Sequence, residues 1–328
     1  SNEFEKLCAV NIGYTAGIET TKVAPQWLEK GNLMDKILVV SNHAKDSYVN
    51  TVAQAQNQQS GEVFPYRLQT PVEVVWENTP MSSEVEEIPG FDPRHDFNFL
   101  CVSQMGPRKN LENTIKWFVE EFIDQEVGLV LKSNLKSNSV IDKEHIEASL
   151  SSILATYPER KCSVSLLHGD LSEGQMRALY EHDKVKAMVN ISHGEGFGLP
   201  LFEAARSALP IITVGWSGQM DFLTFENKDY FSKVKHELKQ VQQSVVWAGV
   251  IEADSMWAYA DQGSYKMTLR QMFKKYDGFV KQAKELQKLV NANFSDEVLF
   301  EGFVGQFLEH SSSESWTSEI EDIIKEYE

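Results

Sequence analysis

Glu195 and Glu203 are separated by seven residues, and Glu195 stands inside a loop that also carries Gly194, Gly196 and Gly198. Glycines let a backbone come close to a ligand and offer bare N–H groups to an anion. Carboxylates accept hydrogen bonds from hydroxyl groups. The pattern therefore predicts a site for a ligand that carries both phosphate and a polyol, and a sugar nucleotide is such a molecule.

The flanking sequence predicts the elements that hold this loop. Residues 188–191 form a short β-rich run typical of a buried strand. Pro200 stands at the first helical position, where its missing N–H is harmless, and the helix it begins has one apolar face. Residues 211–214 read as the next strand. This is a βαβ unit of a parallel sheet, and ligands of such sheets bind at the carboxyl edge of the strands.

The run from His193 to Ala204, HGEGFGLPLFEA, resembles the Glu-x7-Glu signature of the large family of retaining GT-B glycosyltransferases (glycosyl transferases group 1). The Glu–Gly–Phe–Gly core, both carboxylates and the following turns all agree with it. The alternative is an ordinary βα turn with two solvated glutamates. The resemblance implies an α/β fold of GT-B type, with two Rossmann-like domains facing across a cleft. The N-terminal domain is expected to be incomplete, because several βα units and a glycine-rich loop found at its start in the family are absent.

The chain of 328 residues favours two domains over one. We expect a partial N-terminal, acceptor-side domain over 1–90, a donor-binding domain over 91–290, and closing helices with an acidic tail over 291–328. Residues 81–97 are acidic, with two prolines and a glycine, and read as the linker. The resemblance implies that the final helix, residues 296–310, crosses back to the N-terminal domain.

Elsewhere the periodicity predicts a mixture of strands and helices. The expected segments are strands over 36–41 and 72–76, helices over 44–54, 265–273, 280–290 and 297–308, a polar loop over 57–61 and a surface turn over 252–261.

Arg108 and Lys109 fall where a predicted strand ends and a helix begins. Two cations beside a helix N-terminus suit a diphosphate. By resemblance, an Arg and a Lys here neutralise the leaving diphosphate. Lys109 matches the lysine, while Gln104 stands at the usual arginine position and Arg108 is the expected substitute. A solvated basic pair at a helix start is the alternative.

The remaining site residues are those that the resemblance implies. Glu195 would hold hydroxyls of the donor sugar, Glu203 the ribose hydroxyls, and the backbone near Gly169 and Leu171 the base. The catalytic set is thus Lys109, Arg108 and Glu195. The donor-binding set is Glu203, Gly194, Gly196, Phe197, Gly198, Leu199, Gln104, Gly169 and Leu171. No metal is expected, since no Asp-x-Asp motif occurs.

The implied activity is retaining, metal-independent hexosyl transfer from a nucleotide-diphosphate sugar to an acceptor hydroxyl, in glycan or polysaccharide synthesis. No cofactor is expected, and the acceptor would be a carbohydrate or lipid-linked. A nucleotide-sugar-binding protein without transferase activity is the alternative. A Rossmann-type dehydrogenase is disfavoured, because no Gly-x-Gly-x-x-Gly run follows a first strand.

Charge and composition limit the partners. Lys and Arg number 31 against 48 Asp and Glu, a net charge of −17, which argues against broad nucleic-acid binding. No apolar run reaches the roughly 18 residues of a membrane span, and we expect no secretory leader. Three widely spaced cysteines predict buried, reduced thiols. We therefore expect a cytoplasmic protein, with peripheral membrane contact left open.

Overall fold

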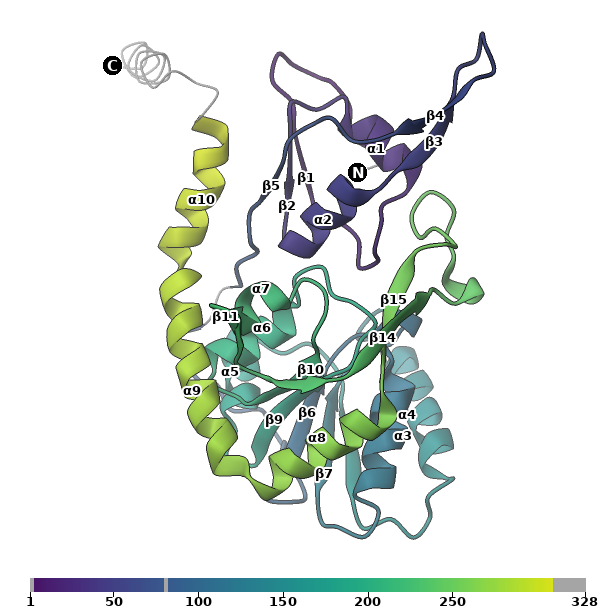
Figure 1. The fold of residues 1–328 in the computed structure, drawn as a ribbon. Helices are drawn as coiled ribbons and strands as arrows, with labels where there is room; N and C mark the ends of the chain where they lie inside the picture. Colours follow the sequence, from purple (N-terminus) through teal and green to yellow (C-terminus); the bar gives the residue numbers. More distant parts are fainter. Residues whose placement is uncertain (1–2, 80–81, 309–328) are drawn as a thin grey trace, which may run out of the picture.

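The structure is a computed structural model that describes residues 3–79 and 82–308. It contains two α/β bodies, drawn one above the other in Figure 1, with the first 79 residues in the upper body. Two successive helices at the C-terminal end run up the side of the two bodies.

The N-terminal body is built on a three-stranded parallel sheet in the order β1-β2-β5. Its central strand is buried along its whole length, as expected for an apolar strand between two neighbours. Two helices and an antiparallel hairpin complete it. The bounds are β1 (Ile12–Thr15), α1 (Pro25–Gly31), β2 (Lys36–Val39), α2 (Asn42–Asn50), β3 (Ala53–Gln56), β4 (Val63–Tyr66) and β5 (Val72–Val74).

The C-terminal body is built on a six-stranded sheet in the order β13-β10-β9-β6-β7-β8, in which all five pairs of neighbouring strands are parallel. Its strands are β6 (Asn98–Val102), β7 (Gly128–Lys132), β8 (Ser163–Leu167), β9 (Val185–Asn190), β10 (Ile211–Val214) and β13 (Ser232–Val234). Its crossover helices are α3 (Leu111–Glu121), α4 (Val140–Leu154), α5 (Glu173–Glu181) and α6 (Leu199–Arg206).

Alternating side chains of these strands divide the C-terminal core into two layers. Phe99 and Leu100 are adjacent on β6, yet Phe99 belongs to one apolar cluster and Leu100 to the other. Successive side chains of a strand point to opposite faces of the sheet, so both faces are covered. The strands that hold the glycine loop are therefore fixed from both sides.

An antiparallel hairpin reaches from the C-terminal body to the N-terminal body. We call residues 236–260 the arm; it contains β14 (His236–Gln240) and β15 (Met256–Ala260). Trp27 Nε1 donates to Gly249 O over 3.0 Å, and Met256 N donates to Thr21 Oγ1 over 3.0 Å. The arm thus joins the two bodies on the side opposite the two C-terminal helices (Figure 1). Smaller elements before it are α7 (Met220–Leu223), β11 (Thr224–Phe225) and β12 (Lys228–Asp229).

The chain ends in α8 (Gln262–Lys274), α9 (Tyr276–Asn293) and α10 (Asp296–Leu308). Helix α10 contacts the N-terminal sheet. Lys36 Nζ donates to Gln306 O over 3.1 Å, and the rings of Tyr14 and Phe303 lie 6.1 Å apart. The predicted return of the last helix to the N-terminal domain is therefore confirmed up to Leu308. The predicted acidic tail lies outside the described residues.

Three expectations were wrong in detail. The helix predicted over 44–54 ends at Asn50, and β3 begins at Ala53, because Thr51 and Val52 are β-branched and favour extended backbone. The surface turn predicted over 252–261 covers residues 253–254, and its second half is β15 of the arm. Cys101 and Cys162 are buried as expected, but Cys8 is exposed.

Candidate functional site

The predicted glycine loop connects β9 to α6 at the carboxyl edge of the large sheet. Helix α6 begins after Gly198, whose φ of 98° is a left-handed conformation that favours glycine. Pro200 stands in its first turn, one position later than predicted. The loop therefore turns sharply out of a buried strand and places Glu195 and the helix N-terminus on one edge.

Glu195 is 4% exposed and is held by four side chains. Its Oε1 accepts from Lys109 at 2.8 Å, Asn190 at 3.1 Å and Ser192 at 2.8 Å. Its Oε2 lies 2.7 Å from Lys109 Nζ and 3.0 Å from Arg108 Nη1. Burial alone would raise the pKa of this carboxyl, but Lys109 and Arg108 outweigh it and lower the pKa to about 2.

The three residues predicted as catalytic therefore form one cluster. Arg108 and Lys109 lie in a 3₁₀ turn, Pro107–Lys109, between β6 and α3. The main chain fixes this turn against the glycine loop, because His193 N donates to Arg108 O over 2.8 Å. Arg108 Nη1 also donates to Gly194 O over 2.6 Å. The carboxyl ends of β6 and β9 thus present two cations and one carboxylate together.

Glu203 lies in a second region, inside α6. It lines a cavity of about 100 Å³ together with Leu171 and Tyr180. Tyr180 donates its hydroxyl to Glu203 Oε2 over 2.7 Å. Burial raises the pKa of Glu203, and the Tyr180 and Arg206 contacts oppose that shift. Two residues predicted to contact the nucleoside, Glu203 and Leu171, are therefore brought to the same cavity.

Other predicted donor-binding residues are placed differently. Gln104 is exposed, and its Nε2 donates to Leu135 O over 2.8 Å. Gly169 lies at the end of β8, where its carbonyl accepts from Lys132 Nζ over 2.6 Å. Phe197 is 2% exposed and packs with other phenylalanines in the core, and Leu199 packs against the same cluster. Any donor contact by Phe197 would therefore come from its main chain.

Gly194 and Gly196 carry no side chain at the positions where the N-terminal body approaches most closely. A Cβ on Gly194 would lie 2.4 Å from Glu19 O, and one on Gly196 would lie 3.2 Å from Ala16 O. The loop that follows β1 thus rests on the bare face of the glycine loop. Glu19 also reaches the cluster directly, because its Oε1 lies 3.1 Å from Arg108 Nη2.

Glu19 is a site residue that was not predicted from the sequence. It is far from Arg108 along the chain, and only the packing of the two bodies brings these residues together. Ser217 was also missed. Its Oγ accepts from Glu195 N over 2.9 Å and so fixes the loop from the turn after β10. The sequence signal for Ser217 was its place between Gly215 and Gly218, in the turn after β10.

Asp221 links the two bodies beside the glycine loop. Its Oδ2 accepts from Asn42 N at 2.8 Å and from Trp76 Nε1 at 2.8 Å, both in the N-terminal part of the chain. Burial raises the pKa of Asp221 even though these donors favour its charged form. His43 contributes a ring contact with Trp216, with centroids 4.7 Å apart.

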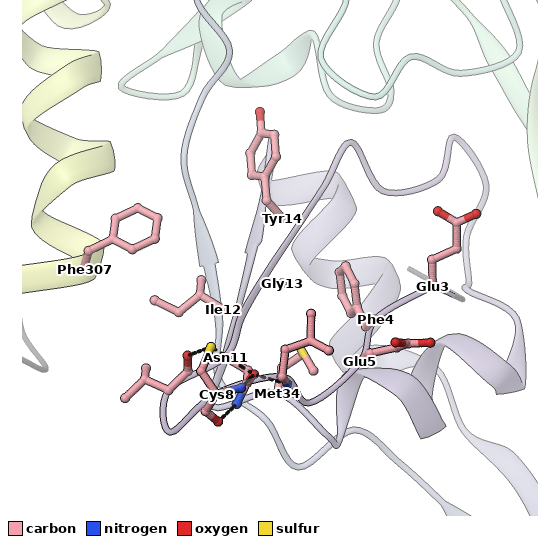
Figure 2. A pocket seen from close by; sticks show the side chains of 12 residues that line it. Glu3, Phe4, Glu5, Cys8, Asn11, Ile12, Gly13, Tyr14, Met34 and Phe307 are labelled. Carbon is pink, nitrogen blue, oxygen red and sulfur yellow. Dashed lines mark hydrogen bonds between the residues drawn. The ribbon is translucent and has the colours of Figure 1, made fainter.

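A larger cavity, of about 650 Å³, lies away from this site. It runs along β1 between the first described residues and α10, and is lined mainly by apolar side chains (Figure 2). Cys8, Tyr14 and Phe307 are among them. None of the predicted site residues lines it.

In residues 3–79 and 82–308, no group of three or more His, Cys, Asp or Glu side chains is arranged to hold a metal ion. Over the same ranges, no helix combines the length and the apolar character needed to cross a bilayer.

Comparison with solved structures identifies the fold. A glycosyltransferase from Rickettsia africae matches with a TM-score of 0.59 and 11% identity, over 92% of this chain and 71% of that one. Sucrose-phosphate synthase from Thermosynechococcus elongatus matches with a TM-score of 0.58 and 15% identity, over 88% and 61%. TarM from S. aureus matches with a TM-score of 0.56 and 11% identity, over 91% and 50%. The chain has the α/β GT-B fold, in a shortened form.

Sequence similarity to curated proteins covers part of this chain. No protein-family model matches it. A segment of 118 residues is 31% identical to the serotype-specific mannosyltransferase WbdA of Escherichia coli, covering 35% of this chain and 13% of WbdA. The chain thus spans about an eighth of that curated relative and about half of TarM.

Proposed function

We propose that this chain carries the donor site of a glycosyltransferase, which moves a sugar from a nucleotide-diphosphate sugar to an acceptor hydroxyl with retention of configuration. One observation carries the proposal: Lys109 and Arg108, at the end of β6, converge with Glu195 of the glycine loop at the carboxyl edge of a parallel sheet. That edge is where ligands of open α/β sheets bind. The names of the relatives agree, since WbdA is a mannosyltransferase and TarM was solved with UDP.

Each group has a role that its surroundings allow. Negative charge builds on the leaving diphosphate as the sugar–phosphate bond breaks, and stabilising it is the main catalytic task. Lys109 and Arg108 would supply that stabilisation without a metal. Glu203, in the cavity with Leu171, would accept hydrogen bonds from the ribose, and Glu195 from the sugar hydroxyls. The acceptor would be a carbohydrate or a lipid-linked sugar, and the product would enter glycan or polysaccharide synthesis.

Lys109→Ala tests this proposal. We expect Lys109→Ala to reduce transfer by about 10²–10³-fold, the usual loss when one donor to a developing oxyanion is removed. Lys116→Ala is the matched control, because Lys116 is partly exposed and pairs with Glu112 within α3. A thermal-shift screen with UDP-, GDP- and ADP-sugars would first identify the donor, since ligand binding raises the apparent stability. Equal transfer by Lys109→Ala and Lys116→Ala would contradict the proposal.

A second candidate is a nucleotide-sugar-binding protein without transferase activity. The observation that favours it is Gln104, which stands at the family's arginine position and turns toward Leu135 rather than toward the cation pair. Isotope-labelled donor would separate the two. Binding without release of free sugar or transfer to any acceptor would favour the second candidate.

A further inference from the structure

Arg108 is the residue through which the two bodies meet at the cation pair. On one side its Nη1 contacts Gly194 O and Glu195 Oε2, at 2.6 and 3.0 Å. On the other side its Nη2 lies 3.1 Å from Oε1 of Glu19. The guanidinium is therefore held by carboxylates from opposite bodies.

The charges of this cluster cancel. Arg108 and Lys109 are matched by Glu195 and Glu19, two cations against two carboxylates. A diphosphate that joined all four groups would bring negative charge without a counterion into a partly buried site. Such charge is costly to bury, so one carboxylate must leave when a diphosphate binds.

The surroundings decide which carboxylate leaves. The Glu195 side chain is 6% exposed and has Lys109, Arg108, Asn190 and Ser192 as partners. The Glu19 side chain is 29% exposed, and within the described parts of the chain Arg108 is its one ion-pair partner. Water can rehydrate Glu19 easily, whereas removing Glu195 would break several buried contacts. Glu19 is the group that leaves at the lower cost.

We propose that Glu19 occupies the anion position on Arg108 until the diphosphate of the donor replaces it. Glu19 lies in the N-terminal body, and it thereby lowers the affinity of the C-terminal body for the donor. It acts through Arg108 and is a positioning residue, not a catalytic one. The main chain of Glu19 also rests on Gly194, so its departure would uncover the face of the glycine loop. The inference rests on the proposed function, because it takes the ligand to be a nucleoside diphosphate.

Isothermal titration with three purified proteins tests the inference: wild type, Glu19→Gln and Lys22→Met. The probes are UDP, GDP and ADP, with uridine, guanosine and adenosine as phosphate-free controls. Glu19→Gln keeps the shape of the side chain but frees Arg108. We expect it to bind the preferred diphosphate about 1.5- to fivefold more tightly than wild type, the range of a partly exposed ion pair. Its affinity for the matching nucleoside should not change.

Lys22→Met is the control for a general loosening of the domain contact. Lys22 pairs with Asp254 of the arm. The Lys22→Met substitution therefore also removes an ion pair between the two bodies, but this pair does not involve Arg108. Lys22→Met should bind the diphosphate as wild type does. Unchanged or weaker binding of the diphosphate by Glu19→Gln would overturn the inference. An equal increase in diphosphate affinity in Lys22→Met would also overturn it. If no diphosphate bound to any of the three folded proteins, the proposed function would fail together with the inference.

Discussion

At the scale of single residues, Glu195 shows how neighbouring charges outweigh burial. A carboxyl so poorly exposed would ordinarily take up a proton, yet Lys109 and Arg108 keep it ionised and lower its pKa to about 2. Glu203, eight positions along, has no cation that outweighs its burial, and its pKa is raised. The two glutamates of one motif therefore titrate in opposite directions.

This difference predicts opposite effects of two similar substitutions on stability. The folded-state pKa of Glu195 lies below its ordinary 4.5, so its ionised form stabilises the fold above pH 4.5, and that stability is lost as the pH falls toward 2. We expect Glu195→Gln to lower the free energy of unfolding by about 3 kcal/mol at pH 7, and by much less at pH 3. Urea unfolding at both pH values measures the effect.

Glu203→Gln is the control, because we do not expect it to lower the free energy of unfolding at pH 7. Because its folded-state pKa is raised, ionised Glu203 costs stability at neutral pH, and this cost disappears in acid. Glu203→Gln should therefore be neutral or stabilising at pH 7. If Glu203→Gln lowered the free energy of unfolding at pH 7 as much as Glu195→Gln does, this account of the two carboxylates would be contradicted.

At the scale of elements, the glycine loop is shaped by the body that rests on it. We predict that Gly194→Ala destabilises the protein by about 1–3 kcal/mol, because the added Cβ would lie 2.4 Å from the main-chain oxygen of Glu19. Gly278→Ala, in α9, is the matched control, since no atom beyond the adjacent backbone of α9 lies within 4 Å of its added Cβ. Alanine is the better helix former, so the control should be neutral or stabilising by up to about 1 kcal/mol. Equal denaturation midpoints for the two variants would show that the contact with Glu19 is absent in solution.

Most elements near the site were predictable because they are local. The βαβ unit around residues 185–214 shows its strand, its helix start and its turn residues in consecutive sequence. The arm was not predicted, because β14 is mostly exposed and polar, and pairing with β15 across a long loop is what orders it. The link between Glu19 and Arg108 was unpredictable for a similar reason: no local pattern records how two bodies dock.

At the scale of the whole molecule, the cysteines report on folding. The chain has three, and Cys8 is the exposed one, beside the cavity of Figure 2. Burial raises the pKa of Cys101 to about 12 even though Lys109 opposes the shift, so its reactive thiolate is scarce. We predict that Ellman's reagent modifies one thiol in the native protein and all three after unfolding in urea. Modification of a second thiol without denaturant would indicate that the large sheet opens under native conditions.

The polypeptide passes between the two bodies twice, once after β5 and once through the junction of α9 and α10. The two passages touch, since the rings of Trp76 and Phe294 lie 4.9 Å apart. Asn78 Nδ2 donates to Asp296 Oδ1 beside them, over 2.9 Å. Because the two connecting segments contact each other, the two bodies have little freedom to slide or twist relative to one another. We expect rotation about a single hinge axis through this contact, with the widest separation at the arm, on the far side of the molecule in Figure 1.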